Sequence, residues 1–210
     1  MRSREMGLVR FGVFLLLSGT ILPGCVLKEP LSNPDQAKLD DRLIGAWKHE
    51  DEKSKDQQSI LFIGKADLRR ALPGIMKAVI VENDGKKQIQ VRTYYFFPTC
   101  LGEVNYANLL DESSLDGAKE KTWDRNRVQE WLLIKYSLEN DRLTILLPDA
   151  IAAEKAITTG EVKGNVEETW LLKIKRITFT DSKDLSRFLV SGGDQKLFSD
   201  DHKMLFSRIK

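Results

Sequence analysis

The chain has 210 residues, a length typical of one domain with an extension, and its 41% hydrophobic and 30% charged residues are typical of a soluble globular protein. Its formal net charge is +2, and removing the first 24 residues takes away three of the 33 basic residues and one of the 31 acidic ones, which leaves 30 of each. A neutral chain lacks the excess of Lys and Arg that binds phosphate, so we exclude nucleic acid as the main partner.

The first predicted element is an apolar run near the N-terminus. Three arginines precede residues 11–22, which read FGVFLLLSGTIL and carry no charge. The run is too short to cross a bilayer, which takes about 20 apolar residues in a helix. A buried core helix is the alternative, but such a helix is normally amphipathic and this run is apolar all round. A positive segment followed by a short apolar run is typical of a secretory signal.

The apolar run ends in Leu22-Pro23-Gly24-Cys25, which resembles the bacterial lipobox, with Pro23 in place of the usual small or aliphatic residue. The resemblance implies that residues 1–24 are a cleaved signal peptide and that Cys25 carries the lipid that attaches the protein to a membrane. Two or more acyl chains anchor a protein stably where one does not. Val26 stands where enterobacteria place an Asp for inner-membrane retention, so we expect a cell-envelope protein on the outer membrane, facing the periplasm.

We expect residues 25–37 to be a lipidated anchor and spacer, stiffened by Pro30 and Pro34, and residues 38–210 to be the globular domain. With Cys25 acylated, Cys100 is the single remaining thiol. Cys100 lies in an apolar stretch with no His nearby in sequence, which favours a buried, inert cysteine over a nucleophile.

Strands dominate the domain. A short helix is predicted over residues 35–43, capped by Asp35. The predicted strands cover residues 43–49, 59–64, 75–82, 87–97, 103–109, 128–138, 143–147, 168–180 and 203–209. The sequence Asn83-Asp84-Gly85 indicates a hairpin, because Asp-Gly accepts the positive φ of such turns. Residues 119–127 are charged and predicted as a loop.

Two helices are predicted in the C-terminal third. Asp149 can cap a helix that runs through Thr159 and ends at Gly160. A second helix covers residues 182–191 and is stopped by Gly192 and Gly193. The chain is therefore predicted to be mainly β, an antiparallel barrel of eight or nine strands with two or three short helices, although a sandwich has similar strand spacing. A barrel is favoured because closure removes exposed strand edges.

The first strand contains Gly45-Ala46-Trp47 after a short helix, which resembles the entry motif of the lipocalins. The resemblance implies a barrel that holds one small ligand, with Gly45 making room at the floor, Trp47 plugging it, and an Arg stacked over the Trp. Arg208 in the last strand, or Arg187 in the preceding helix, is the candidate for that Arg. The alternative is that Trp47 is a core aromatic of an early strand.

Alternation in the strand at 87–97 gives candidates for a ligand pocket. These residues serve equally well as core; they are Ile89, Val91, Tyr95 and Phe97, with Trp47, Trp131 and Trp170.

His49 and His202 are the two histidines, and pairing of the first and last strands brings them near each other among carboxylates. Two imidazoles with carboxylates can bind zinc or copper. The alternative, a pair of surface histidines among solvated charges, is favoured, and we assign no metal and no cofactor.

The sequence carries no nucleophile elbow, phosphate-binding Gly-rich loop or CxxC motif, and adjacent acids on a strand point to opposite faces. We therefore expect a non-enzymatic, lipid-anchored barrel that binds a small apolar ligand or an envelope partner. The alternative is a structural or interaction lipoprotein with a filled core. A hollow interior of several hundred Å³ would favour the first.

Overall fold

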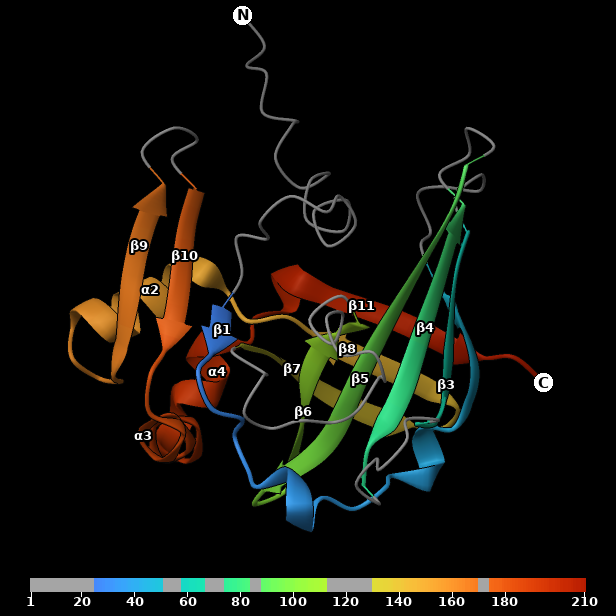
Figure 1. The fold of residues 1–210 in the computed structure, drawn as a ribbon, viewed down its shortest axis with the longest axis horizontal. Helices are drawn as coiled ribbons and strands as arrows, with labels where there is room; N and C mark the ends of the chain where they lie inside the picture. Colours follow the sequence, from blue (N-terminus) through green and yellow to red (C-terminus); the bar gives the residue numbers. More distant parts are fainter. Residues whose placement is uncertain (1–24, 51–57, 67–73, 84–87, 113–129, 170–173) are drawn as a thin grey trace, which may run out of the picture.

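Eight strands close into a barrel in the computed structural model, which describes residues 25–50, 58–66, 74–83, 88–112, 130–169 and 174–210. The barrel strands are β2 (Gly45–His49), β3 (Gln58–Lys65), β4 (Met76–Asn83), β5 (Ile89–Leu101), β6 (Val104–Asp111), β7 (Trp131–Glu139), β8 (Arg142–Leu146) and β11 (Lys203–Arg208). Each pairs antiparallel with the next, and β11 pairs with β2 to complete the ring (Figure 1). The predicted mainly β, antiparallel barrel is confirmed.

The barrel strands follow one another as neighbours, so short turns join several of them. The turn between β7 and β8 holds Asn140 and Asp141 at φ 48° and 61°. Short polar side chains tolerate this left-handed backbone, which matches the twist of a two-residue hairpin. The predicted hairpin of β4 and β5 is present, with Asn83 opposite Ile89; its predicted turn residues 84 and 85 lie outside the described residues, as does the predicted loop at 119–127.

Between β8 and β11 the chain leaves the barrel and builds a second layer, which we call the annex. Its elements are α2 (Ala150–Thr158), β9 (Gly164–Thr169), β10 (Ile174–Phe179), α3 (Ser182–Phe188) and α4 (Asp194–Leu197). In Figure 1 the annex lies to the left of the barrel. Asp149 caps α2 as predicted, accepting hydrogen bonds from the amides of Ile151 and Ala152.

The strand β1 (Cys25–Leu27) joins the annex to the barrel. It runs antiparallel to β7, with Val26 opposite Leu132, and parallel to β10. The edge of β7 is free to accept it because the pairing of β8 with β7 stops at Leu146, opposite Lys135. Beyond that point β1 continues the sheet as the neighbour of β7.

Two hydrophobic cores result from this arrangement. The barrel interior is lined by a cluster of twelve buried residues: Leu43, Trp47, Leu61, Ile63, Met76, Ala78, Tyr94, Phe96, Ala107, Tyr136, Leu143 and Phe206. The second core lies between the outer face of β5–β7 and the annex, and includes Leu27, Tyr95, Phe97, Trp131, Leu133, Phe179 and Phe198. Since fully burying one large apolar side chain contributes about 1.5–3 kcal/mol, the annex is bound firmly to the barrel.

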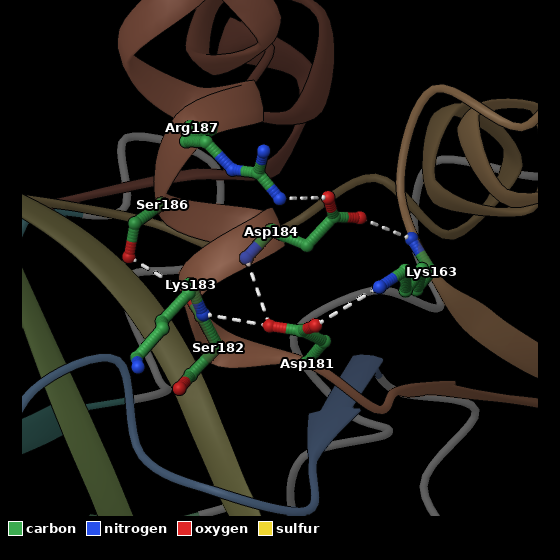
Figure 2. Close-up of polar contacts among 7 residues, drawn as sticks. All are labelled: Lys163, Asp181, Ser182, Lys183, Asp184, Ser186 and Arg187. Carbon is green, nitrogen blue, oxygen red and sulfur yellow. Dashed lines mark hydrogen bonds and ion pairs between the residues drawn. The ribbon is translucent and has the colours of Figure 1, made fainter.

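The start of α3 is fixed to the chain that leads into β9 (Figure 2). Asp181 caps the helix by accepting hydrogen bonds from the amides of Lys183 and Asp184, at 3.1 and 3.0 Å. The ammonium of Lys163 lies 3.2 Å from Asp181, and the Lys163 amide donates to Asp184 at 2.8 Å. The hydrogen bond from the Asp184 amide, followed by the contact with Lys163, lowers the pKa of Asp181, because both stabilise its charged form.

Residues 25–37 were expected to be a spacer, and the structure packs them against the barrel instead. Leu27 and Leu31 are buried. The side chain of Asn108, fully buried on β6, accepts a hydrogen bond from the Leu31 amide at 2.7 Å and donates to Thr99 at 2.8 Å. The two prolines stiffen this segment, but its leucines pack into the domain, so the segment is part of the fold and not a free spacer.

The helix predicted over residues 35–43 is two separate 3-10 turns, Pro34–Gln36 and Asp41–Leu43, capped by Asn33 and Asp40. Asn33 and Asp40 each supply a local hydrogen bond that stops a longer helix from forming.

One prediction in the C-terminal third was wrong and another is confirmed. The single strand predicted at 168–180 is two antiparallel strands, β9 and β10, on either side of residues 170–173, which lie outside the described residues. The helix predicted to stop at Gly192 does stop there, because Gly192 takes a non-helical φ of 100°, and the short helix α4 follows as a separate element. Here glycine permits a change of direction in the chain.

Candidate functional site

The barrel holds a partly open cavity of about 330 Å³. This is at the lower end of the range of about 300–1,000 Å³ typical of small-molecule sites. Its wall is mostly apolar and includes Leu61, Ala78, Tyr94, Phe96, Ala107, Ile134, Tyr136 and Met204. A wall with so few polar groups favours aliphatic or aromatic ligand surface over a charged ligand.

One end of the barrel, which we call the floor, is closed by Trp47 and Arg208. Trp47 is fully buried, and its indole N–H donates to the carbonyl of Leu43 at 2.9 Å. The Arg208 guanidinium carbon lies 4.1 Å from the centre of the Trp47 ring, a cation–π contact. Nη1 of Arg208 also donates to the carbonyl of Ile44 at 2.8 Å.

Gly45 is required at the floor for two reasons. It has a φ of 145°, and a Cβ placed on it would lie 2.7 Å from Nη1 of Arg208. The guanidinium therefore occupies the space that any other residue's side chain would take. The structure thus brings together Gly45, Trp47 and Arg208, whereas Arg187 lies on α3, where it pairs with Asp184 at 2.8 Å.

Toward the other end, four polar residues line the cavity; we call them the rim: His49, Ser59, Glu82 and His202. The Ser59 hydroxyl lies 3.4 Å from Glu82. Burial raises the pKa of the Glu82 carboxyl, because a low-dielectric wall disfavours its charged form. His202 Nε2 is 4.0 Å from Asp149, and the His49 ring lies 5.1 Å from that of Phe206.

Cys25 contributes to the cavity wall close to Leu132, Leu147 and Ala150. Its side chain is 2% exposed. Burial, with a smaller contribution from the charge of Asp149, raises the pKa of its thiol to about 12. A cysteine nucleophile needs the opposite shift, since only the thiolate attacks. Cys25, Asp149 and His202 therefore do not make a catalytic arrangement.

The residues of β5 that the alternation predicted to line the cavity lie on the opposite face of the strand. Ile89 and Val91 are 70% and 61% exposed. Tyr95 and Phe97 belong to the outer core beneath the annex, as does Trp131. Trp47 lies at the floor and Trp170 lies outside the described residues.

The residues of β5 that reach the cavity are Tyr94 and Phe96. Both faces of this strand are buried over residues 94–97, so alternation alone does not distinguish inside from outside there. The aromatic run at residues 94–97 was the available signal for a strand covered on both sides.

His49 and His202 both line the cavity, and Phe206 lies opposite His49 in the pairing of β11 with β2. Within the residues that the structure describes, no three His, Cys, Asp or Glu side chains lie close enough to hold a metal ion. Cys100, expected to be buried, is exposed, because β5 ends there at a turn; its thiol donates to the carbonyl of Gly102 at 3.1 Å.

No protein-family model, curated protein or solved structure matches this chain. Among the helices of the described segments, none is long and apolar enough to cross a membrane. The geometry of the barrel therefore carries the functional argument.

Proposed function

We propose that this chain is a lipid-anchored cell-envelope lipoprotein whose barrel binds one small apolar ligand without catalysing a reaction. The observation that carries the binding part is the mostly apolar cavity of about 330 Å³ inside the barrel. A filled barrel would leave no such space. The resemblance of Gly45 and Trp47 to the lipocalin entry motif supports the same reading.

The anchor is supported by the sequence before the barrel. Three arginines, a short apolar run and Leu22-Pro23-Gly24-Cys25 together resemble a lipoprotein signal, and attachment at Cys25 would place the domain in the cell envelope, on the outer membrane facing the periplasm. Cys25 is the first residue of β1, which pairs with the barrel strand β7. A lipid at this position would hold the barrel directly against the membrane surface.

The ligand is a slim, mostly aliphatic molecule with a small uncharged polar end. Most of the cavity wall is apolar, so it can contact an aliphatic chain, and polar side chains, Ser59 and His202 among them, line the rim. A ligand carboxylate would meet Glu82, whose own charged form burial already disfavours. An alcohol or an ester fits this chemistry better than an acid.

Binding is tested by titrating a fluorescent long-chain alcohol into residues 25–210 carrying Cys25→Ser, a range that contains every element of both cores. Saturable one-to-one binding supports the proposal. The variant Ala78→Phe fills the cavity and should abolish binding, whereas Val79→Phe, the next residue on β4 but facing outward, should not. Because overpacking destabilises by about 1–3 kcal/mol, Ala107→Leu provides a second filled variant.

If the alcohol does not bind while the protein is folded, the cavity is not a ligand site. The structural or interaction lipoprotein then becomes the better account. Equal binding by Ala78→Phe and Val79→Phe would place the ligand elsewhere on the surface and would also contradict the proposal.

A further inference from the structure

Cys25 lies where a residue carrying a membrane anchor is not expected, inside the fold. The strand β1 is paired on both sides, with β7 and with β10. The Cys25 side chain is 2% exposed and forms part of the cavity wall. Cys25 also belongs to the core beneath the annex, so a lipid bonded to this sulfur would begin where that core meets the cavity wall.

Two arrangements would accommodate a diacylglyceryl group on a buried sulfur. Either β1 leaves the sheet, or an acyl chain enters the adjacent space. Leaving the sheet would expose Leu27, which is 1% exposed, and would break the bond from the Lys28 amide to Phe179 at 3.0 Å. It would also pull on the hydrogen bond from the Leu31 amide to the side chain of Asn108. The apolar cavity offers the second arrangement without those losses.

We propose that one acyl chain of the lipid on Cys25 occupies the cavity of its own barrel, so that the protein carries its ligand covalently. This inference rests on the proposed lipidation. The remaining chains stay in the bilayer, and the barrel therefore stands with its rim toward the membrane. The lipid on Cys25 would then serve both as the membrane anchor and as the occupant of the cavity.

The size and polarity of the cavity agree with this occupant. A volume of about 330 Å³ is at the lower end of the range of small-molecule sites, which favours one slim chain over several. The rim residues Ser59, His49 and His202 stand at the end where Cys25 lies. Hydroxyl and imidazole groups there can meet the ester oxygens that join the chain to glycerol.

The order of events follows from the chemistry of the sulfur. In the docked strand the thiol pKa is about 12, so the sulfur is protonated and unreactive at neutral pH. Cys25 is also 2% exposed in a strand paired on both sides, which puts its sulfur out of reach of an acylating enzyme, so acylation precedes the docking of β1. The strand and its acyl chain then enter the fold together.

The test uses the full chain expressed in bacteria that are fed a fatty acid with a photoreactive diazirine in its chain. The label enters the lipid anchor, and illumination of intact membranes links it to whatever lies beside it. Mass spectrometry of the purified protein then maps the links. The proposal predicts links from residue 25 to the peptides that hold Tyr94 and Phe96 or Ile134 and Tyr136.

Matched variants locate those links. In Ala78→Phe the links to the cavity peptides should be lost, because the added ring fills the space. In Val79→Phe they should persist, because that side chain faces outward from the same strand. Links retained in both variants would overturn the proposal.

Two negative results are distinguishable. Label found on residue 25, with links only to bilayer lipids, overturns the self-occupied cavity and leaves the proposed binding of an exchangeable ligand standing. Absence of label from residue 25 overturns this inference together with the lipid anchor. Neither result depends on the alcohol titration, which tests the cavity of the protein without its lipid.

Discussion

Arg208 illustrates how one side chain closes the barrel. It stacks on Trp47, donates to the carbonyl of Ile44, and lies 3.1 Å from Asp141 in the turn between β7 and β8. We predict that Arg208→Met lowers the free energy of unfolding by about 1–3 kcal/mol, because it removes the cation–π contact and leaves carbonyls unpaired. Urea denaturation followed by tryptophan fluorescence measures the change.

The matched control is Arg142→Met on the neighbouring strand. The Arg142 side chain is 66% exposed and pairs with Glu50 at 3.1 Å, a surface ion pair worth about 0–1 kcal/mol. If both variants lose the same free energy of unfolding, the contact of Arg208 with Trp47 stabilises the fold no more than a surface ion pair, which contradicts the prediction.

Glu82 is a charged group in a mostly apolar wall. Burial raises the pKa of Glu82 in the folded state, so the folded protein holds this proton more tightly than the unfolded chain does. The free energy of unfolding therefore falls as the pH rises from about 4.5 through the raised pKa. Glu82→Gln removes the ionisable group, so the variant does not lose this free energy of unfolding as the pH rises. We predict that the variant melts about 1–3 °C higher than the wild type at pH 7 and that the two melting temperatures converge at about pH 4. Thermal scans at several pH values test this, and a constant difference across them would contradict the account.

At the scale of elements, one polar cluster ties α4 to the barrel. The Tyr106 hydroxyl donates to Asp194 at 2.6 Å, and the Lys135 ammonium lies 2.5 Å from the same carboxylate. Burial, together with the hydrogen bond to Asp194, raises the pKa of Tyr106 well above its usual value. The neutral phenol is therefore the form that the folded state keeps.

We predict that Tyr106→Phe costs about 1–3 kcal/mol at pH 7, because a buried carboxylate loses a hydrogen bond. In the wild type the neutral Tyr106 phenol adds to the free energy of unfolding. That addition is fully present below about pH 10 and declines as the pH rises toward the pKa of Tyr106 in the folded state. The variant should lose less stability than the wild type above pH 10. Denaturant titrations at pH 7 and 10.5 measure both effects, and Lys196→Gln on the exposed face of α4 is the control.

Asn108 holds the segment after β1 in place. It is fully buried and bonds both to the Leu31 amide and to Thr99. We predict that Asn108→Ala speeds hydrogen exchange at the Leu31 amide and exposes residues 28–37 to proteolysis, while Asn105→Ala, half-buried on the same strand, changes neither. Unchanged exchange in Asn108→Ala would contradict this role.

The strands were predictable from the sequence where only one face of a strand is buried and where turn residues mark its ends. Asn83-Asp84-Gly85 located the hairpin of β4 and β5. The hairpin of β9 and β10 was missed, because residues 169–174 contain no Gly, Pro, Asn or Asp. The inward phase of β5 was missed because the annex covers its outer face, and that contact joins parts of the chain far apart in sequence.

Parts of the site were accessible to sequence reasoning and parts were not. Gly45, Trp47 and Arg208 could be placed together because a closed barrel pairs its first and last strands. The position of Cys25 in the cavity wall could not be anticipated, because it depends on β1 filling the place that β8 leaves beside β7. A local pattern of two prolines predicted a spacer, and only the tertiary contacts of Leu27 and Leu31 oppose that reading.

At the scale of the whole molecule, the barrel and the annex place the cavity, the rim and the proposed anchor at one end. The floor lies at the other end, closed by Arg208. An anchor at Cys25 would turn the rim toward the bilayer, where apolar molecules are abundant. This orientation gives a short path between membrane and cavity, consistent with the proposed binding of an aliphatic ligand.

The most direct test of that account is native mass spectrometry of residues 25–210 with Cys25→Ser, exported to the periplasm of the host and purified without detergent. The account predicts a co-purifying small molecule that is lost on denaturation and absent from Ala78→Phe. A bare polypeptide mass, with no uptake of an added long-chain alcohol, would contradict it and favour an interaction lipoprotein that binds nothing inside its barrel.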